Sequence, residues 1–446
     1  MPQEKVLLIS CYFPPVGGIG VQRAVSLARY LPQAGIEVFV LTTRSSVPTM
    51  DTDLLKLIPK EVHVHRTWTL EPPFAMRKKL WSRLNSGSAS RKTESGVISK
   101  VKKIVARQIK HFTCPDPQAL WYPFAIRRAS KLIRKEKIQT VLVTAPPFSA
   151  FLIANELKRR FPHLCTIADV RDEWLEYFVK EFVFRGDEYI AARCAAIERA
   201  TVESCDRVVS VTQTSLDAIR SRYPEQPRSK FVLIPNGYDP AVFSRFRSRP
   251  HRSNKLVITY TGTLYKPCSP KPYLDALDSL PQIRSRFENR FVGRVAEEFD
   301  RGIFETRHCS VRLLDFVPQS EALRFMEESD VLLLPWTDRF NIPGKLFEYL
   351  ATGKPILALC YPDSDVAQVI RETASGWCVN PDDIREVQRA LTEIHALGGK
   401  YPHDRNWEAV RRYERPRLAA EYARVIRDAS QPNERRNLKL EEVAAR

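Results

Sequence analysis

The sequence predicts an α/β protein built from two Rossmann-like domains that face a cleft. Two stretches, starting at Lys5 and Leu256, each begin with an apolar run, continue into a glycine-containing loop and then show a helical pattern. Residues 241–254 are rich in turn-formers and arginine and are predicted to be a linker. The predicted domains are therefore residues 1–240 and 255–405. A C-terminal helix over 406–430 is expected to pack back across the domains, before a flexible tail over 431–446.

The first stretch has the order strand, glycine loop, helix, strand, which is typical of a right-handed βαβ unit. The predicted strands are Lys5–Ser10 and Ile36–Thr42, and the helix is Val21–Leu31. The loop contains Gly17, Gly18 and Gly20, and backbone without side chains can approach a bound group closely. The alternative is a tight turn without a ligand. A dinucleotide site is disfavoured, because the spacing is not G-x-G-x-x-G and no acidic residue ends the second strand.

Further strands and helices alternate through the rest of this domain. The predicted helices are Ala125–Arg134, Ala150–Arg160 and Asp187–Cys205, and the predicted strands are Gln139–Thr144, Cys165–Asp169, Arg207–Thr212 and Phe231–Ile234. Polar residues at strand ends, namely Thr144, Asp169, Arg171 and Asp172, are candidates to line a ligand site, because ligands bind beyond the carboxyl ends of parallel strands. The alternative for Asp169, Arg171 and Asp172 is a salt-bridged turn.

The second domain repeats the βα pattern. The predicted strands are Leu256–Thr261, Phe287–Val292, Ser310–Leu314, Asp330–Pro335, Pro355–Leu359 and Trp377–Val379. The predicted helices are Lys271–Leu280, Ser320–Glu328, Ala367–Thr373, Asp382–Ala396 and a long helix over Trp407–Ala429. Ser320 is the expected N-cap of its helix. Gly262 and Thr263 form a second glycine loop after the first of these strands.

The stretch from Asn341 to Leu359 has the pattern of an anion site. A loop ends at Gly344, a short helix follows, and the amides at a helix N-terminus attract negative charge. Lys345 lies beside them and Glu348 lies one turn further on. We expect the first two features to hold a diphosphate and the carboxylate to hold a ribose. The alternatives are an ordinary surface lysine and an exposed helix carboxylate.

Composition limits the classes of protein to consider. The chain has 446 residues, of which 43% are hydrophobic and 27% charged, as in ordinary globular proteins. Its nine cysteines are scattered without a CxxC pair, which favours buried thiols and no metal site. No signal peptide is recognisable, so we expect a cytoplasmic protein. The net charge of +18 indicates an acidic partner.

Basic residues concentrate between positions 76 and 110, with eleven Lys or Arg against the single acid Glu94. Val97, Val101, Ile104 and neighbouring apolar residues share one helical face there, which suits an anionic membrane surface. We therefore expect a peripheral protein at the inner face of the cell membrane. The alternative is a solvated insertion. Nucleic acid is disfavoured as a partner, because the segment has few aromatics for base stacking.

Taken together, the motifs resemble the GT-B fold, family 4-type glycosyltransferases that use nucleotide sugars. The resemblance covers nearly the whole chain and depends on FPPVGGIGVQRAVSLARYL, TAPPFSA, IADVRDEW, IPNGYDPAVF, TYTGTLY, FVPQSEAL, ESDVLLLPW and IPGKLFEYLATGKPILAL. It implies transfer of a sugar from a UDP- or GDP-linked donor with retention of anomeric configuration. No cofactor and no essential metal are expected beyond the nucleotide-sugar co-substrate.

The resemblance also implies roles for single residues. The donor is expected in the second domain and a lipid-linked or growing glycan acceptor in the first, as in cell-surface polysaccharide biosynthesis. The implied acceptor-side residues are Thr144, Arg171 and Asp172. The implied donor-binding residues are Gly17, Gly18, Gly262, Thr263, Gly344, Lys345, Leu346 and Glu348. The candidate catalytic residues are Asp172, Lys345 and Lys266, where Lys271 is a second basic residue near the loop.

The chain departs from the family pattern at one position. Glu348 matches the second acid of a paired-glutamate motif, but Phe340 stands eight residues earlier, where the first acid belongs. Asp338, Asn341 or the backbone of residues 342–344 are candidates to hold the sugar instead. Two other functions on the same fold stay open, a sugar-nucleotide epimerase and a non-catalytic nucleotide-sugar-binding protein.

Overall fold

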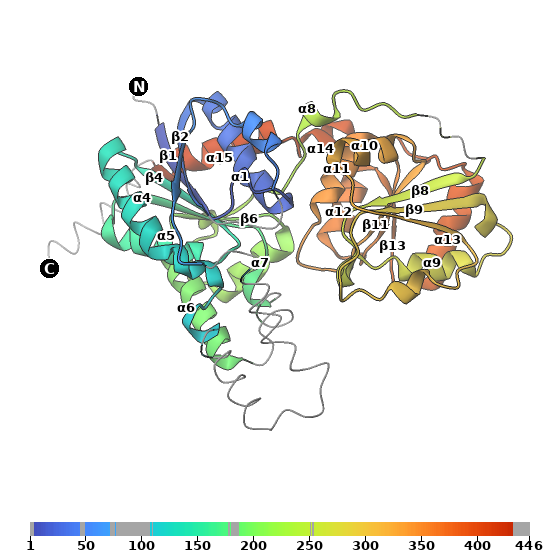
Figure 1. Cartoon of the computed structure of the whole chain (residues 1–446), viewed down its shortest axis with the longest axis horizontal. Helices are drawn as coiled ribbons and strands as arrows, with labels where there is room; N and C mark the ends of the chain where they lie inside the picture. The colour runs from blue at the N-terminus through green and yellow to red at the C-terminus, as the bar shows by residue number, and fades with distance from the viewer. Residues whose placement is uncertain are drawn as a thin grey trace. The chain divides into compact units, whose positions relative to one another are not determined.

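The computed structural model describes residues 4–44, 50–71, 110–176, 187–249 and 254–430, with residues 76, 108, 179 and 251. The chain divides into two compact units (Figure 1). The first comprises Met1–Val211, Ser215–Ile234 and Ala419–Arg446, and the second comprises Thr212–Thr214 and Pro235–Leu418. Most of the predicted basic insertion over 76–110, and the predicted tail over 431–446, lie outside the described residues.

The first unit is organised around a seven-stranded sheet in the order β3-β2-β1-β4-β5-β6-β7, in which all neighbouring strands are parallel. Its strands are β1 (Glu4–Ser10), β2 (Ile36–Thr43), β3 (His63–Thr67), β4 (Thr140–Ala145), β5 (Cys165–Val170), β6 (Arg207–Ser210) and β7 (Phe231–Leu233). Its helices are α1 (Gln22–Tyr30), α4 (Tyr122–Glu136), α5 (Ala150–Arg160), α6 (Glu188–Ser204), and most of α7 (Gln213–Arg222) and α15 (Arg415–Ser430).

The second unit holds a six-stranded parallel sheet in the order β10-β9-β8-β11-β12-β13. Its strands are β8 (Leu256–Thr261), β9 (Phe287–Val292), β10 (Ser310–Leu314), β11 (Val331–Pro335), β12 (Ile356–Leu359) and β13 (Gly376–Val379). Its helices are α8 (Pro240–Phe243), α9 (Lys271–Asp278), α10 (Gln319–Glu327), α11 (Gly344–Thr352), α12 (Asp365–Thr373), α13 (Ile384–Ala396) and α14 (Trp407–Arg411).

Each sheet has its own hydrophobic core. In the first unit α4, α5 and α6 pack side by side on the sheet, and the core includes fully buried Leu7, Val141 and Leu157. In the second unit α9 packs against α13, and Leu332, Phe347 and Leu357 belong to the core. Strands covered on both faces are apolar along their whole length, which is why short apolar runs located them in the sequence. The predicted fold class, two Rossmann-like α/β domains, is confirmed.

The helices differ from the prediction in three details. The helix α7 was missed, because its sequence is mostly polar and only Ser215, Leu216 and Ile219 are buried. Ser320 is not an N-cap, because α10 already starts at Gln319 and the preceding cap position is Pro318, which has no side-chain bond to offer.

The long helix predicted over Trp407–Ala429 is two helices, α14 and α15. Its break has a long-range cause: the amide of Tyr238 donates to Tyr413, and the amide of Arg415 donates back to Tyr238. The segment between the helices is therefore drawn into a parallel bridge of Tyr238 with Glu414. Gly237 allows this approach, because a Cβ there would lie 2.1 Å from the carbonyl oxygen of Tyr413.

Candidate active site

The helix α11 starts at the carboxyl edge of the second sheet, directly after the loop that follows β11. No side chain caps its N-terminus, where Pro343 occupies the cap position. At the other end Gly353 closes the helix in the left-handed conformation, with φ of 74°, as glycine does most readily. The amides of Gly344 and Lys345 at the start of α11 can therefore donate to an anion, whereas the amide of Leu346 donates to Pro343.

Lys345, Glu348 and Gly262 lie together at this edge. The ammonium of Lys345 is 3.5 Å from a carboxylate oxygen of Glu348, and both side chains are partly exposed. A Cβ at Gly262 would lie 3.0 Å from Cε of Lys345, so the lysine stem passes directly over the second glycine loop. Gly262 also has φ of +144°, which L-residues rarely adopt. The structure thus brings a cation and a carboxylate of α11 next to bare backbone from a loop much earlier in the chain.

Neighbouring residues hold the second glycine loop in shape. The hydroxyl of Tyr260 donates to the carbonyl of Thr263 at 2.8 Å, and the amide of Leu264 donates to Arg294 at 2.8 Å. Gly293 is close enough to Gly262 that a Cβ would meet the Gly262 oxygen at 2.0 Å. The loop therefore follows β8 in a conformation that depends on glycines in two adjacent strand-end segments.

Two other predicted donor residues lie differently. Leu346 is fully buried in the core, and its amide donates to Pro343 at 3.0 Å, so its side chain packs the helix rather than facing solvent. Lys266 begins the short 3-10 helix η7 (Lys266–Cys268) and has an exposed side chain. The carbonyl of Pro267 in η7 accepts from the amide of Thr337 at 3.0 Å, which ties this turn to the loop after β11.

The loop that carries Phe340 is organised by a buried carboxylate. Asp338 accepts from the amides of Phe340 and Asn341, at 2.8 and 3.2 Å, and from Nδ2 of Asn341 at 2.8 Å. The indole of Trp336 also donates to the carbonyl of Asn341 at 2.6 Å. Asp338 and Asn341, the two side chains predicted as possible replacements for the missing acid, are thus bonded to each other within their own loop.

In the first unit Arg171 joins three segments at the carboxyl edge of the sheet. Its guanidinium donates to the carbonyls of Gly20 and Pro146, and at 3.2 Å to that of Ala145. Burial lowers the pKa of Arg171, with Asp172 opposing that shift. The first glycine loop, in which Gly18 has φ of +99°, is thereby tied to the loop after β4.

Thr144 belongs to a buried polar cluster behind this edge. Its hydroxyl donates to Asp169 at 2.7 Å, and Arg23 binds the same carboxylate through Nε and Nη2 at 3.0 Å. Tyr422 of α15 donates to Asp169 at 2.6 Å and accepts from Arg23. Burial alone would lower the pKa of Arg23, but Asp169 and Tyr422 together outweigh this and raise it. Thr144 is 1% exposed, so its hydroxyl serves the cluster and not solvent.

Comparison with known families decides which family the chain represents. Residues 86–242 match the model of Glycosyltransferase Family 4, and residues 255–396 match that of Glycosyl transferases group 1. These matches together cover about two thirds of the chain. The chain belongs to the family 4-type glycosyltransferases.

Two curated relatives of this glycosyltransferase are bacterial. The probable glycosyltransferase WbjE of Pseudomonas aeruginosa is 22% identical over 237 residues, which are 51% of this chain and 59% of the relative. The amylovoran biosynthesis glycosyltransferase AmsK of Erwinia amylovora is 30% identical over 89 residues, which are 19% of this chain and 21% of the relative. The chain thus aligns with little more than half the length of the first of these and a fifth of the second.

Solved structures show that this glycosyltransferase has the GT-B fold. The sucrose-phosphate synthase of Thermosynechococcus elongatus superposes with a TM-score of 0.65 at 14% identity, over 95% of this chain and 98% of that one. HepE of Anabaena in complex with UDP gives a TM-score of 0.59 at 11% identity, over 95% of this chain and 100% of that one. At identities this low, the similarity is evidence for the fold alone.

Arg23 and Tyr422, which bind Asp169, were not among the residues predicted from the sequence. The sequence offers a signal for Arg23, because a charged residue stands among the apolar residues of the first helix. In the structure its side chain is 8% exposed. Tyr422 gives no comparable signal, since a tyrosine in a helix is ordinary and its partners lie hundreds of positions away. Asp172, the candidate catalytic acid of the first unit, is half-buried directly after Arg171.

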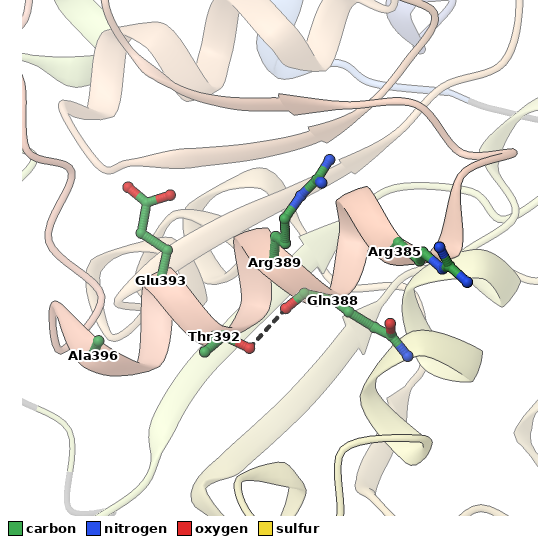
Figure 2. A pocket seen from close by; sticks show the side chains of 6 residues that line it. All are labelled: Arg385, Gln388, Arg389, Thr392, Glu393 and Ala396. Atoms are coloured by element: carbon green, nitrogen blue, oxygen red, sulfur yellow. Dashed lines mark hydrogen bonds between the residues drawn. The ribbon is translucent and has the colours of Figure 1, made fainter.

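The hollow shown in Figure 2 contains none of the predicted site residues. It runs along α13, and its lining residues are Arg385, Gln388, Arg389, Thr392, Glu393 and Ala396. All six come from one helix. In the part of the chain that the structure describes, no three His, Cys, Asp or Glu residues are grouped as metal ligands, and no helix is long and apolar enough to cross a membrane.

Proposed function

We propose that this protein transfers a sugar from a nucleoside-diphosphate sugar, UDP- or GDP-linked, to a lipid-linked or growing glycan, with retention of anomeric configuration. The observation that carries the proposal is the cluster at the start of α11, where Lys345 spans Gly262 and pairs with Glu348. A cation beside uncapped helix amides suits a diphosphate. A carboxylate one turn away suits the two hydroxyls of a ribose.

Similar proteins support the donor class and the setting. HepE, which has the same fold, is solved in complex with UDP, and AmsK is described as an enzyme of amylovoran biosynthesis. By analogy we place this protein in cell-surface polysaccharide biosynthesis at the cytoplasmic face of the membrane. Family membership supports retention, because the family 4 type is expected to retain the anomeric configuration.

In the proposed reaction the bond between the sugar C1 and the diphosphate oxygen breaks while an acceptor oxygen bonds to C1 on the same face. The acceptor proton passes to the departing diphosphate, so the main task of the protein is to stabilise negative charge on that group. Lys345 and the amides of α11 are placed for this, and Lys266 and the second glycine loop are further candidates. Removing one such donor costs about 2–4 kcal/mol of barrier in comparable sites. The proposed reaction uses no essential metal.

The experiment is a thermal-shift series with nucleosides, nucleoside diphosphates and nucleotide sugars. A ligand present at about 100 times its Kd should raise the free energy of unfolding by about 2.7 kcal/mol. We expect Lys345→Ala to reduce the shift given by UDP or GDP but not that given by the nucleoside, and Glu348→Gln to reduce both. Lys400→Ala, an exposed lysine of the same unit, is the control. If no uridine or guanosine nucleotide shifts the melting temperature, the proposal fails.

Product analysis then tests the chemistry. We expect turnover of the donor to depend on the acceptor and the new linkage to keep the donor's anomeric configuration in NMR spectra. A second candidate function, nucleotide-sugar binding without transfer, is favoured by one observation: Phe340 replaces an acid, and Asp338 is bonded within its own loop. Tight nucleotide binding with neither transfer nor hydrolysis would support that second function.

A further inference from the structure

Two tyrosine hydroxyls bracket Gly262 in the second glycine loop. The hydroxyl of Tyr349, on α11, accepts from the amide of Thr261 at 2.9 Å and lies 3.3 Å from the Thr261 hydroxyl. The hydroxyl of Tyr260 donates to the carbonyl of Thr263 at 2.8 Å. The two tyrosines are buried, with 0% and 3% of their surface exposed. Neither tyrosine was among the residues predicted for the site.

The sheet explains why Thr261 needs a partner outside it. β8 pairs with β11 only at Ile258 and Thr259, which lie opposite Val331 and Leu332. Beyond these pairs β11 continues in register with β12. Successive amides of a strand in a parallel sheet point to alternate sides, so the amide of Thr261 faces the side from which β11 has departed. A buried amide without a hydrogen bond is costly, and a hydroxyl from α11 takes the place of the missing strand.

The same face of α11 holds the cation of the proposed site over this loop. Lys345 and Tyr349 are four residues apart, so their side chains lie one above the other on the helix. A Cβ at Gly262 would lie 3.0 Å from Cε of Lys345 and 3.0 Å from the hydroxyl of Tyr260. The amide of Gly262 donates to Val292 of β9 at 2.8 Å, so the loop is fixed between β9 and α11.

One amide of the loop stays available for a ligand. Thr263 is exposed, and in the described part of the chain nothing accepts from its amide. At the start of α11 the amides of Gly344 and Lys345 are available in the same way. How these three donors lie relative to one another depends on the bond between Thr261 and Tyr349, because that bond joins the loop to the helix.

We propose that Tyr349 is a positioning residue for the diphosphate of the donor: its hydroxyl fixes the second glycine loop against α11, so that the amide of Thr263 and the first amides of the helix converge on one group. The inference rests on the proposed function, because it says how the same site is assembled. Tyr349 is fully buried, so it acts through the loop and not by contact with the ligand. Tyr260 holds the same loop on the other side of Gly262.

A fixed loop matters because hydrogen bonds weaken steeply when donor and acceptor are out of line. Donors that are already in place also need no reorganisation when negative charge develops on the departing group. Without the Tyr349 hydroxyl, the amide of Thr261 would be a buried donor without an acceptor. The loop would then shift to satisfy this amide, and the amide of Thr263 would move with it.

The first test is calorimetric titration of Tyr349→Phe, which removes one hydroxyl and keeps the ring in the core. We expect the Kd of UDP or GDP to rise at least about tenfold, the factor that one hydrogen bond to a charged group contributes. The Kd of the nucleoside, which has no diphosphate, should stay unchanged. Tyr260→Phe should act in the same direction, and it decides the question if Tyr349→Phe does not fold.

Tyr273→Phe is the matched control. Tyr273 of α9 is also fully buried, and its hydroxyl donates to Asn289 of β9 and not to the glycine loop. It therefore loses a buried hydrogen bond, as Tyr349→Phe does, and should keep the diphosphate affinity of the wild type. Hydrogen–deuterium exchange of the ligand-free proteins adds a measurement that needs no nucleotide: the amides of residues 261–264 should exchange faster in Tyr349→Phe and not in Tyr273→Phe.

Inorganic pyrophosphate as a second probe separates this inference from the proposed function. A wild type that binds pyrophosphate but no nucleotide would overturn the proposed function, and a loss of pyrophosphate affinity in Tyr349→Phe would keep the positioning role. If Tyr349→Phe binds the diphosphate as tightly as Tyr273→Phe does, or if its loop exchanges no faster, the positioning role is overturned whatever the nucleotide. A wild type that binds neither nucleotides nor pyrophosphate overturns both.

Discussion

Arg171 is held by a geometry that no other side chain could reproduce. Its planar fork offers several N–H donors in fixed directions, and three of them meet carbonyls of Gly20, Ala145 and Pro146. Its own amide also donates to Ala145 at 2.9 Å. The first glycine loop and the loop after β4 thus share one cation. Sequence alone marked Arg171 as a residue of the acceptor site, while the structure shows its donors directed at loop backbone.

Arg171→Lys should therefore loosen these loops although the charge is kept. A single ammonium cannot satisfy three carbonyls spread around a guanidinium, and each hydrogen bond that is lost contributes about 0.5–1.5 kcal/mol. We expect the free energy of unfolding to fall by about that amount in urea denaturation. The melting shift given by UDP or GDP should persist, because the residues proposed to hold the nucleotide lie in the second unit.

The matched control for this prediction is Arg159→Lys. Arg159 lies on the exposed side of α5, where it pairs with Glu156 at 2.8 Å, so its replacement should change stability little. Equal stability of the Arg171 variant and the wild type would show that the three carbonyl bonds contribute nothing.

At the scale of elements, the sequence predicts correctly those strands and helices whose pattern is local. The strands β8, β9 and β10 and the helix α5 have the bounds that the sequence predicts, because apolar runs and local helical periodicity determine them. The start of α11 at Gly344 was predicted for the same reason. One failure depends on a distant partner: the break before α15 requires Tyr238, which lies far back in the chain.

The candidate site shows the same division. The family resemblance implied that Lys345 and Gly262 both bind the donor, and topology explains how they meet, because loops after neighbouring parallel strands share an edge. The bonds of Asp338 within its loop and the approach of Lys345 to Glu348 depend on side-chain geometry, which no pattern of residue types encodes.

Gly237→Ala tests the break between α14 and α15. A Cβ at this position would stand 2.1 Å from the Tyr413 oxygen and 2.7 Å from Leu418 Cδ1, and backbone cannot move away as a flexible side chain would. The bridge of Tyr238 with Glu414 would have to open, so we expect a loss of at least about 2 kcal/mol in the free energy of unfolding.

Gly302→Ala provides the comparison for that measurement in urea. The three atoms nearest to its Cβ would all belong to the side chain of Asp300, the closest at 3.0 Å, and this side chain can shift by the few tenths of an ångström required. We expect this variant to unfold at nearly the same urea concentration as the wild type. A Gly237→Ala protein as stable as the Gly302→Ala protein would mean that the close approach is easily relieved.

At the scale of the whole molecule, the first unit is not one continuous piece of chain. The chain leaves it at Pro235, builds the second unit and returns at Ala419, so that α15 completes the first. Tyr422 is the side chain that binds this returning helix to the buried pair of Arg23 and Asp169. A buried ion pair depends on every hydrogen bond that its members make, because neither charged group can hydrogen-bond to water.

Tyr422→Phe removes only the hydroxyl and keeps the ring over the guanidinium of Arg23, whose centre lies 5.1 Å from the ring centroid. The carboxylate of Asp169 then loses one donor, and the free energy of unfolding should fall by about 1–3 kcal/mol in urea denaturation. Tyr401→Phe is the control, because the ring of Tyr401 packs edge-on against Trp377 and that contact survives the change. Since the hydroxyl joins the last helix to the first, we expect α15 to gain hydrogen–deuterium exchange together with α1 and β5. Faster exchange confined to α15 would mean that the helix is held by its apolar face alone. The ion pair of Arg23 and Asp169 would then be stable without the Tyr422 hydroxyl.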